Sequence, residues 1–258
     1  MRILFIRHAD PDYKYDALTE KGQKEAEYLA EYLAQREITQ ICSSPLGRAY
    51  LTAKAVADKT NQQITICEWL KELSGNVDVN MDPELLKAFP DSHYNEEEKR
   101  YDRHIPWDAV PSYLERHPEL LDAQKWKESD IALHSNVLPI YDYKIREFDH
   151  FLKERGYERM NLFYKVNQPN KDTYVLFCHL GAMCLLLSHI VNSSPYVLWN
   201  SFCSAPSGIT ELVSEEREEG VALFRILKAG DISHLSLKEE PPAFSARFAE
   251  CYTDNDRH

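Results

Sequence analysis

The chain has 258 residues, and its 30 lysines and arginines against 42 aspartates and glutamates give a formal net charge of −12. Hydrophobic residues make up 43% and charged residues 28% of it, which excludes disordered, collagenous and membrane-spanning chains. The acidic excess argues against nucleic acid or an anionic membrane as partner, because no basic stripe is present to neutralise phosphates. A local cationic pocket can still bind a small anion.

The cysteines and the apolar runs indicate a cellular compartment. The six cysteines form no C-x-x-C pair, and the first apolar run, Ile3 to Ile6, is too short for a secretory signal. No apolar stretch approaches the roughly 20 residues of a membrane helix. We therefore expect a soluble cytoplasmic protein with reduced thiols.

The first 75 residues alternate between short apolar runs and helical patterns. Residues 2–6 predict a buried strand that ends in Arg7-His8, and residues 38–42 and 64–67 predict two more strands. Thr19 is the expected N-cap of the first helix. The apolar face of this helix consists of Ala26, Leu29, Ala30 and Leu33, and most of the glutamates Glu25, Glu27 and Glu31 are expected to point away from it. A second helix follows Gly47. This order predicts a parallel sheet covered on both faces.

Residues 76–130 break this pattern. They have no clear period, they contain five of the 13 prolines, and Trp107 and Trp126 lie among many charges. We interpret them as an inserted segment that its aromatic residues fold. It is either a lid over the carboxyl ends of the strands or a surface excursion without substrate contact.

Regular patterns resume with a helix over residues 138–155, which ends before Gly156. Residues 173–177 predict a strand that delivers Cys178-His179, and residues 181–191 predict a buried helix. Residues 208–213 and 221–227 predict a hairpin at the edge of the sheet.

Two predicted strands, distant in sequence, thus each end in a histidine. Adjacent parallel strands bring their carboxyl ends together, so His8 and His179 are expected to meet there. Arg7 and Arg48 fall at the same edge, the latter near the start of the second helix. Two guanidiniums, two imidazoles and a helix N-terminus make a phosphate-sized cationic pocket.

Several motifs, in this order, resemble the histidine phosphatase superfamily, which has the phosphoglycerate-mutase-like fold. They are Arg7-His8, the segment 18–26, the segment 43–49 with Thr52-Ala53, the segment 70–75, His179, and Asp231 to Leu235. The expected fold class is α/β, a three-layer α/β/α sandwich with a mostly parallel sheet, an edge hairpin and an inserted cap. We expect a single domain over residues 1–258, with residues 76–130 as the cap.

The resemblance implies a metal-independent phosphatase without a cofactor, acting on a small phosphorylated metabolite. His8 would be the nucleophile that forms a phosphohistidine, which requires its other ring nitrogen to be held as a donor by an acceptor such as a backbone carbonyl. Arg7, Arg48 and His179 would bind the phosphoryl oxygens. Glu72 would protonate the leaving oxygen and then activate water.

The chain also departs from the family pattern. Ala9 and Leu180 stand where the family usually has glycines, which leaves a catalytically weak phosphate-binding module as one alternative. A second alternative is phosphoglycerate-mutase-type transfer, although the serine, tryptophan and asparagine pattern of mutases is absent after His8. A metal site is disfavoured, since no H-E-x-x-H or C-x-x-C pattern occurs and arginine cannot coordinate a cation. The sequence indicates neither the substrate nor the oligomeric state.

Overall fold

The computed structural model describes residues 1–243, 245, 251 and 253, and they divide into two compact units. The first unit consists of Met1–Glu72, Asp149–Met183 and the chain from Cys203 onward, and the second of Leu73–Phe148 and Cys184–Phe202. Residues 76–130 fall within the second unit. Their action as a cap inserted into one domain over residues 1–258 stays a prediction, and part of that range lies outside the described residues.

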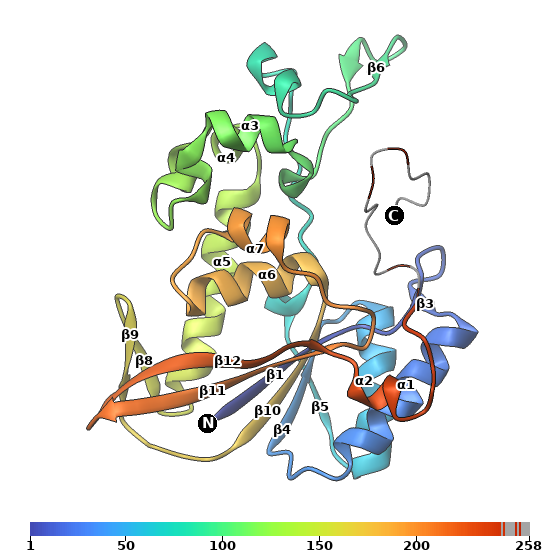
Figure 1. Ribbon diagram of the computed structural model, residues 1–258, viewed down its shortest axis with the longest axis vertical. Helices are drawn as coiled ribbons and strands as arrows, with labels where there is room; N and C mark the ends of the chain where they lie inside the picture. The colour runs from blue at the N-terminus through green and yellow to red at the C-terminus, as the bar shows by residue number, and fades with distance from the viewer. Residues whose placement is uncertain (244, 246–250, 252, 254–258) are drawn as a thin grey trace. The chain divides into compact units, whose positions relative to one another are not determined.

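The first unit contains an eight-stranded sheet in the order β5-β4-β10-β1-β11-β12-β9-β8 (Figure 1). Its strands are β1 (Arg2–Arg7), β4 (Gln40–Ser43), β5 (Ile64–Ile66), β8 (Tyr157–Met160), β9 (Phe163–Val166), β10 (Thr173–Cys178), β11 (Ile209–Glu218) and β12 (Val221–Asp231). The strands β5, β4, β10 and β1 pair in parallel, and the pairs from β1 to β8 are antiparallel. The predicted α/β class with a central sheet is therefore confirmed.

Helices cover both faces of the parallel half of the sheet. On one face α1 (Glu20–Leu33) and α2 (Gly47–Thr60) bury an apolar cluster with β1, β4 and β10 that includes Leu4, Ile6, Leu29, Leu33, Ile41, Val56, Val175 and Phe177. On the other face Phe151, near the end of α5 (Val137–Lys153), stacks edge-on against Tyr174 of β10. Alternate residues of a strand point to opposite faces, which explains why Tyr174 and Val175 belong to different layers.

The remaining elements of the first unit are short. They are the hairpin of β2 (Pro11–Asp12) and β3 (Ala17–Leu18), the 3₁₀ helix η1 (Glu68–Leu70), the start of α6 (Leu180–Ile190), and α8 (Ser233–Ser236). Thr19 caps α1 as predicted, because its side chain accepts a hydrogen bond from the Gly22 N–H.

Two local predictions were wrong. The hairpin of β11 and β12 is not at the edge, because the hairpin of β8 and β9 extends the sheet beyond it. The sequences of β8 and β9 mix polar and apolar residues, since buried, half-buried and exposed positions are mixed along both short strands, and they give no apolar run to detect. Glu25 was expected to turn away from the core but is fully buried, because it shares a helix face with Gly22 and Leu29.

The second unit is built from short helices and aromatic contacts. Its elements are η2 (Pro83–Lys87), β6 (Tyr94–Asn95), β7 (Arg100–Tyr101), η3 (Pro106–Asp108), α3 (Pro111–Arg116), η4 (Pro118–Leu121), η5 (Lys125–Glu128), α4 (Asp130–Leu133), the first part of α5, the later part of α6, and α7 (Pro195–Ser201). Trp126 is fully buried against the rings of Tyr141 and Tyr196, and Trp107 packs on Trp199. This agrees with an insertion folded by its aromatic residues. Over the residues described, none of the helices has the length and apolar character that crossing a membrane requires.

Candidate active site

The register of β1 and β10 brings the two strand-end histidines together. Arg7 pairs with Cys178 across the parallel ladder, and the His8 N–H donates to the Cys178 carbonyl at 3.0 Å. The histidine after each strand then lies beside the other, with ring centroids 5.1 Å apart. The apolar strands and their polar ends therefore suffice to place this pair.

The ring of His8 is held in one tautomer. Its Nδ1 lies 2.8 Å from the carbonyl oxygen of Ala9, and since a carbonyl only accepts, Nδ1 carries the proton. Burial, reinforced by the charge of Arg7, lowers the pKa of His8 to about 3. The imidazole is thus neutral at physiological pH, with the lone pair on Nε2.

Arg7 ends β1 and is almost fully buried beside His8. One terminal nitrogen donates to the Ser204 carbonyl at 2.7 Å and the other to the Ser245 carbonyl at 3.1 Å. Its Nε–H is buried and has no hydrogen-bond partner within the described part of the chain. A buried donor without a partner lowers the stability of the folded protein, so its presence indicates a place where a ligand can bind.

Arg48 lies in the first turn of α2 and has the same feature. Its terminal nitrogen pairs with Asp16 at 2.6 Å, while its buried Nε also finds no partner among the described residues. Asp16 has a φ of 48° and accepts a second hydrogen bond from the Gly47 N–H at 2.6 Å. A Cβ at Gly47 would come within 2.0 Å of the Asp16 carbonyl oxygen, so only glycine permits this approach.

His179 is fully buried and contacts the end of a third strand. Its Nε2 lies 2.9 Å from the hydroxyl of Ser44, and the Ser44 N–H donates to the Phe177 carbonyl of β10. Ser44 follows β4 directly, so the parallel ladder fixes its position beside His179.

Glu72 lies against the start of the helix that follows His179. Its carboxylate accepts hydrogen bonds from the N–H groups of Ala182 at 2.9 Å and Gly181 at 3.3 Å, both in the first turn of α6. The first N–H groups of a helix have no partner within the helix, and the Glu72 carboxyl oxygens satisfy two of them. The structure thus anchors Glu72 next to the strand end that carries His179.

The two departures from the family pattern do not strain the backbone. Neither Ala9 nor Leu180 has a positive φ in the described chain, so their side chains cause no conformational penalty. The Ala9 N–H donates to the hydroxyl of the buried Thr52 at 3.0 Å. The Thr52 hydroxyl of α2 therefore holds the backbone that follows His8.

Sequence reasoning did not single out four polar residues that hold this site: Asp16, Glu25, Ser44 and Thr52. Each contacts a predicted site residue or the two residues that follow His8. Ser44, Thr52 and Glu25 lie inside recognised motifs, which is the one signal that points to them. Asp16 carries no such signal, because a carboxylate at a turn is usually exposed.

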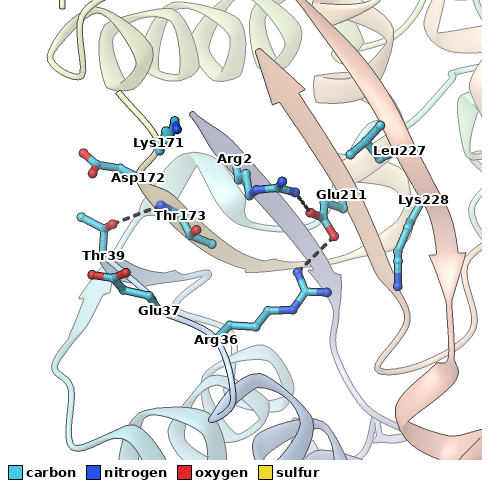
Figure 2. A pocket seen from close by; sticks show the side chains of 10 residues that line it. All are labelled: Arg2, Arg36, Glu37, Thr39, Lys171, Asp172, Thr173, Glu211, Leu227 and Lys228. Carbon is cyan, nitrogen blue, oxygen red and sulfur yellow. Dashed lines mark hydrogen bonds and ion pairs between the residues drawn. The ribbon is translucent and has the colours of Figure 1, made fainter. Parts of the chain in front are cut away.

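Two other features lie outside the predicted site. Among the described residues, one group of three side chains, Asp82, Asp130 and His134 of the second unit, comes close enough to hold a metal ion, and none of them was predicted as a site residue. A cavity of about 890 Å³ lies at the amino ends of the strands, where Arg2 and Arg36 point at Glu211 (Figure 2). The cations of that cavity shown in Figure 2 pair largely with carboxylates of the protein.

A family model matches the first part of the chain, and two curated relatives match shorter stretches of it. The model described as histidine phosphatase superfamily (branch 1) matches residues 3–123. Phosphoserine phosphatase 1 of Hydrogenobacter thermophilus is 33% identical over 73 residues, which cover 25% of this chain and 35% of that protein. The 2,3-bisphosphoglycerate-dependent phosphoglycerate mutase of Thermoplasma acidophilum is 32% identical over 80 residues, which cover 27% and 40%. The matches thus span well under half of either relative.

Solved structures with a similar fold cover almost the whole chain. A mycobacterial glucosyl-3-phosphoglycerate phosphatase aligns with a TM-score of 0.55 and 18% identity over 89% of this chain and 98% of that one. A phosphoserine phosphatase of Entamoeba histolytica in complex with 3-phosphoglyceric acid aligns with a TM-score of 0.56 and 16% identity over 91% and 98%. At this identity the likeness concerns the fold.

Proposed function

We propose that this chain, a member of the histidine phosphatase superfamily by the match over residues 3–123, hydrolyses phosphate monoesters of small metabolites through a phosphohistidine on His8. The observation that carries the proposal is the state of His8. Its Nδ1 proton is held by the Ala9 carbonyl, and the charges of Arg7 and Arg48, each with an unpartnered buried Nε–H, act on the same ring. A neutral nucleophile next to spare cationic donors suits attack on a dianionic phosphate ester.

The reaction we propose has two displacements. In the first, Nε2 of His8 attacks phosphorus, the ester P–O bond breaks, and Glu72 gives its proton to the leaving alcohol. In the second, Glu72 takes a proton from water, the water oxygen attacks phosphorus, and the P–N bond breaks to release phosphate and restore His8. Arg7, Arg48 and His179 stabilise the oxygens that carry charge in both transition states.

The buried donors support the role of the arginines. Each Nε–H that lacks a protein partner gains one when a phosphoryl oxygen enters, so part of the cost of burying it is recovered only in the bound state. Asp16 keeps Arg48 oriented meanwhile. Although partial burial opposes it, hydrogen bonds from Gly47 and Arg48 hold the pKa of Asp16 below its ordinary value, so it stays an anion.

Substrate, compartment and partners are part of the same proposal. A small phosphorylated metabolite fits a pocket of two arginines and two histidines better than a polymer does, since the rest of the surface is acidic. The six cysteines form no C-x-x-C pair, which is in keeping with a cytoplasmic location. Transfer between two positions of one sugar acid, the mutase alternative, would appear as an isomerised phosphate ester without release of phosphate.

The test is hydrolysis of a chromogenic phosphate ester by the wild type and by His8→Ala. The substitution is expected to lower kcat/KM by at least about 10³-fold, because no other group supplies the nucleophile. His150→Ala, on an exposed position of α5, is the matched control and should keep full activity. Full activity of folded His8→Ala would overturn the mechanism.

A further inference from the structure

A buried glutamate that the mechanism does not use lies behind the nucleophile. Glu25 of α1 is 0% exposed and has no arginine or lysine as a hydrogen-bond partner in the described chain. Its Oε2 accepts the N–H of Asp10 at 2.8 Å, and its Oε1 accepts the N–H of Ala243 at 3.1 Å. Buried carboxylates are usually paired with a cation, whereas the partners of Glu25 are two backbone N–H groups. These two groups show which backbone segments Glu25 holds in place.

The local structure keeps α1 tightly against the chain that follows His8. A Cβ at Gly22 would lie 2.1 Å from the Asp10 carbonyl oxygen, so glycine is required for this approach. The Thr19 N–H donates to the same carbonyl at 3.1 Å, and the Thr19 hydroxyl donates to the Asp10 carboxylate at 2.7 Å. Both polar groups of the Asp10 backbone, the N–H and the C=O, are thus hydrogen-bonded to α1 or its N-cap residue.

The N–H that Glu25 accepts and the carbonyl that holds His8 belong to one peptide unit. That unit is the Ala9–Asp10 peptide: its N–H donates to Glu25, and its C=O accepts the Nδ1 proton of His8 at 2.8 Å. Hydrogen bonds at the two ends of an amide strengthen one another, because each increases the polarisation of the other. An anion on the N–H side therefore makes the carbonyl a better acceptor for the imidazole proton.

We propose that Glu25 is a positioning residue for His8, which acts through the Ala9–Asp10 peptide to fix the Nδ1–H tautomer and to raise the electron density at Nε2. The effect of Glu25 on catalysis rests on the proposed function. The series of hydrogen bonds from Glu25 to His8 is independent of that function. The arrangement resembles a carboxylate that orients a catalytic histidine, with a peptide group inserted between them.

The groups that face Glu25 determine when it is charged. Burial raises its pKa to about 7; the Asp10 carboxylate acts in the same direction, while the N–H groups of Asp10 and Ala243 and the ammonium of Lys21 act against it. Lys21 is itself paired with Glu240 of the C-terminal segment. The hydrogen bonds that connect Glu25 to His8 are consequently strongest above pH 7, and they weaken below pH 7 as Glu25 is protonated.

The variant that tests this is Glu25→Gln, which keeps the size of the side chain and removes the charge. Glu211→Gln is the matched control, because Glu211 is also a buried glutamate of the first unit but lies among Arg2 and Arg36. We expect Glu25→Gln to lower kcat/KM about tenfold, the loss that follows when a charge-assisted hydrogen bond becomes a neutral one. In the wild type, kcat/KM should decline as pH falls below 7, and this decline should be absent in Glu25→Gln. Glu211→Gln should keep both the kcat/KM and the pH dependence of the wild type.

A measurement on the resting protein separates this inference from the proposed function. The Nδ1 proton of His8 is followed by proton–nitrogen NMR between pH 5 and pH 9 without substrate. His8 itself stays neutral in this range, so a downfield shift with a midpoint near 7 reports the ionisation of a neighbour. We expect this transition in the wild type and in Glu211→Gln and not in Glu25→Gln.

Each outcome decides one of the two claims. An Nδ1 resonance that does not respond near pH 7 in the wild type overturns the inference, whether or not Glu25→Gln folds. The transition together with a wild type that hydrolyses no phosphate ester keeps the hydrogen-bond chain and overturns the function. Unchanged kcat/KM and an unchanged pH profile in folded Glu25→Gln, beside an active wild type, overturn the positioning role.

Discussion

Strand β1 has an arginine at each end, and the two arginines differ in their hydrogen-bond partners. At the amino end Arg2 and Arg36 both bind the buried carboxylate of Glu211, beside a cavity of about 890 Å³. At the carboxyl end Arg7 and Arg48 keep buried Nε–H groups without partners in the described chain. The arginines beside the cavity have a carboxylate partner, whereas the Nε–H groups at the carboxyl end have no partner among the described residues. An anion is therefore expected to bind at the carboxyl end.

Buried carboxylates differ between the two ends in the same way. Burial alone would raise the pKa of Glu211, but Arg36 and Arg2 hold it below its ordinary value. Glu25, near the carboxyl end, has backbone partners, and burial raises its pKa to about 7. One glutamate therefore stabilises the fold as a permanent anion, while the other titrates beside the nucleophile.

Removing the arginine at each end of β1 should give the largest contrast. Arg7→Ala is expected to lower kcat/KM by about 10²–10³-fold, the usual effect of losing one donor to a charge that develops in the transition state. Arg2→Ala should leave kcat/KM unchanged, because the Arg2 side chain pairs with Glu211 at the far end of the strand. Steady-state kinetics on both variants measure this, and equal losses in the two would remove the distinction between the strand ends.

The second contrast concerns stability and pH at Glu25. Because the pKa of Glu25 in the folded state lies above its unfolded value of 4.5, its contribution to stability is fully present below pH 4.5 and is lost as pH rises through about 7. The loss amounts to roughly 3 kcal/mol. Urea unfolding at pH 5 and pH 8 should show Glu25→Gln gaining stability relative to the wild type at the higher pH. A constant difference would show that Glu25 does not titrate in the folded protein.

Glu211 should show the opposite sign. Its lowered pKa gives stability that is present above the unfolded value and lost as pH falls through the folded pKa. Since the side chain of Arg2 is 49% exposed, solvent screens the pair, and Glu211→Gln should cost about 1 kcal/mol at pH 7. Unfolding curves measure the cost, with unchanged kcat/KM as the companion result. A loss of activity without a loss of stability would place Glu211 in the site.

The smallest effect is expected at Ser44. Removing its hydroxyl in Ser44→Ala takes one hydrogen bond from His179, which should lower kcat/KM by roughly three- to tenfold. The neighbouring Ser43→Ala is the matched control, since the Ser43 hydroxyl donates to the Ser44 carbonyl. Equal effects of the two variants would assign the loss to packing at the end of β4.

The sequence predicted what depends on apolar runs and their ends. Residues 2–6 and 173–177 are continuous apolar strands followed by polar residues, so the meeting of His8 with His179 follows from parallel pairing alone. The hairpin of β8 and β9, in which buried and exposed positions are mixed, has no such run and was missed. Glu25 and Asp16 were missed because their partners are backbone and side-chain groups brought near by folding, which no spacing in the sequence encodes.

The most direct test of the account is the covalent state of His8 during turnover. Rapid mixing with a phosphate ester, followed by an alkaline quench and mass spectrometry, should find one phosphoryl group on Nε2 of His8 in the wild type and none in His8→Ala. The adduct should be lost in acid, as expected for a P–N bond. Turnover without a phosphorylated protein, or a phosphoryl group on another residue, would contradict the account.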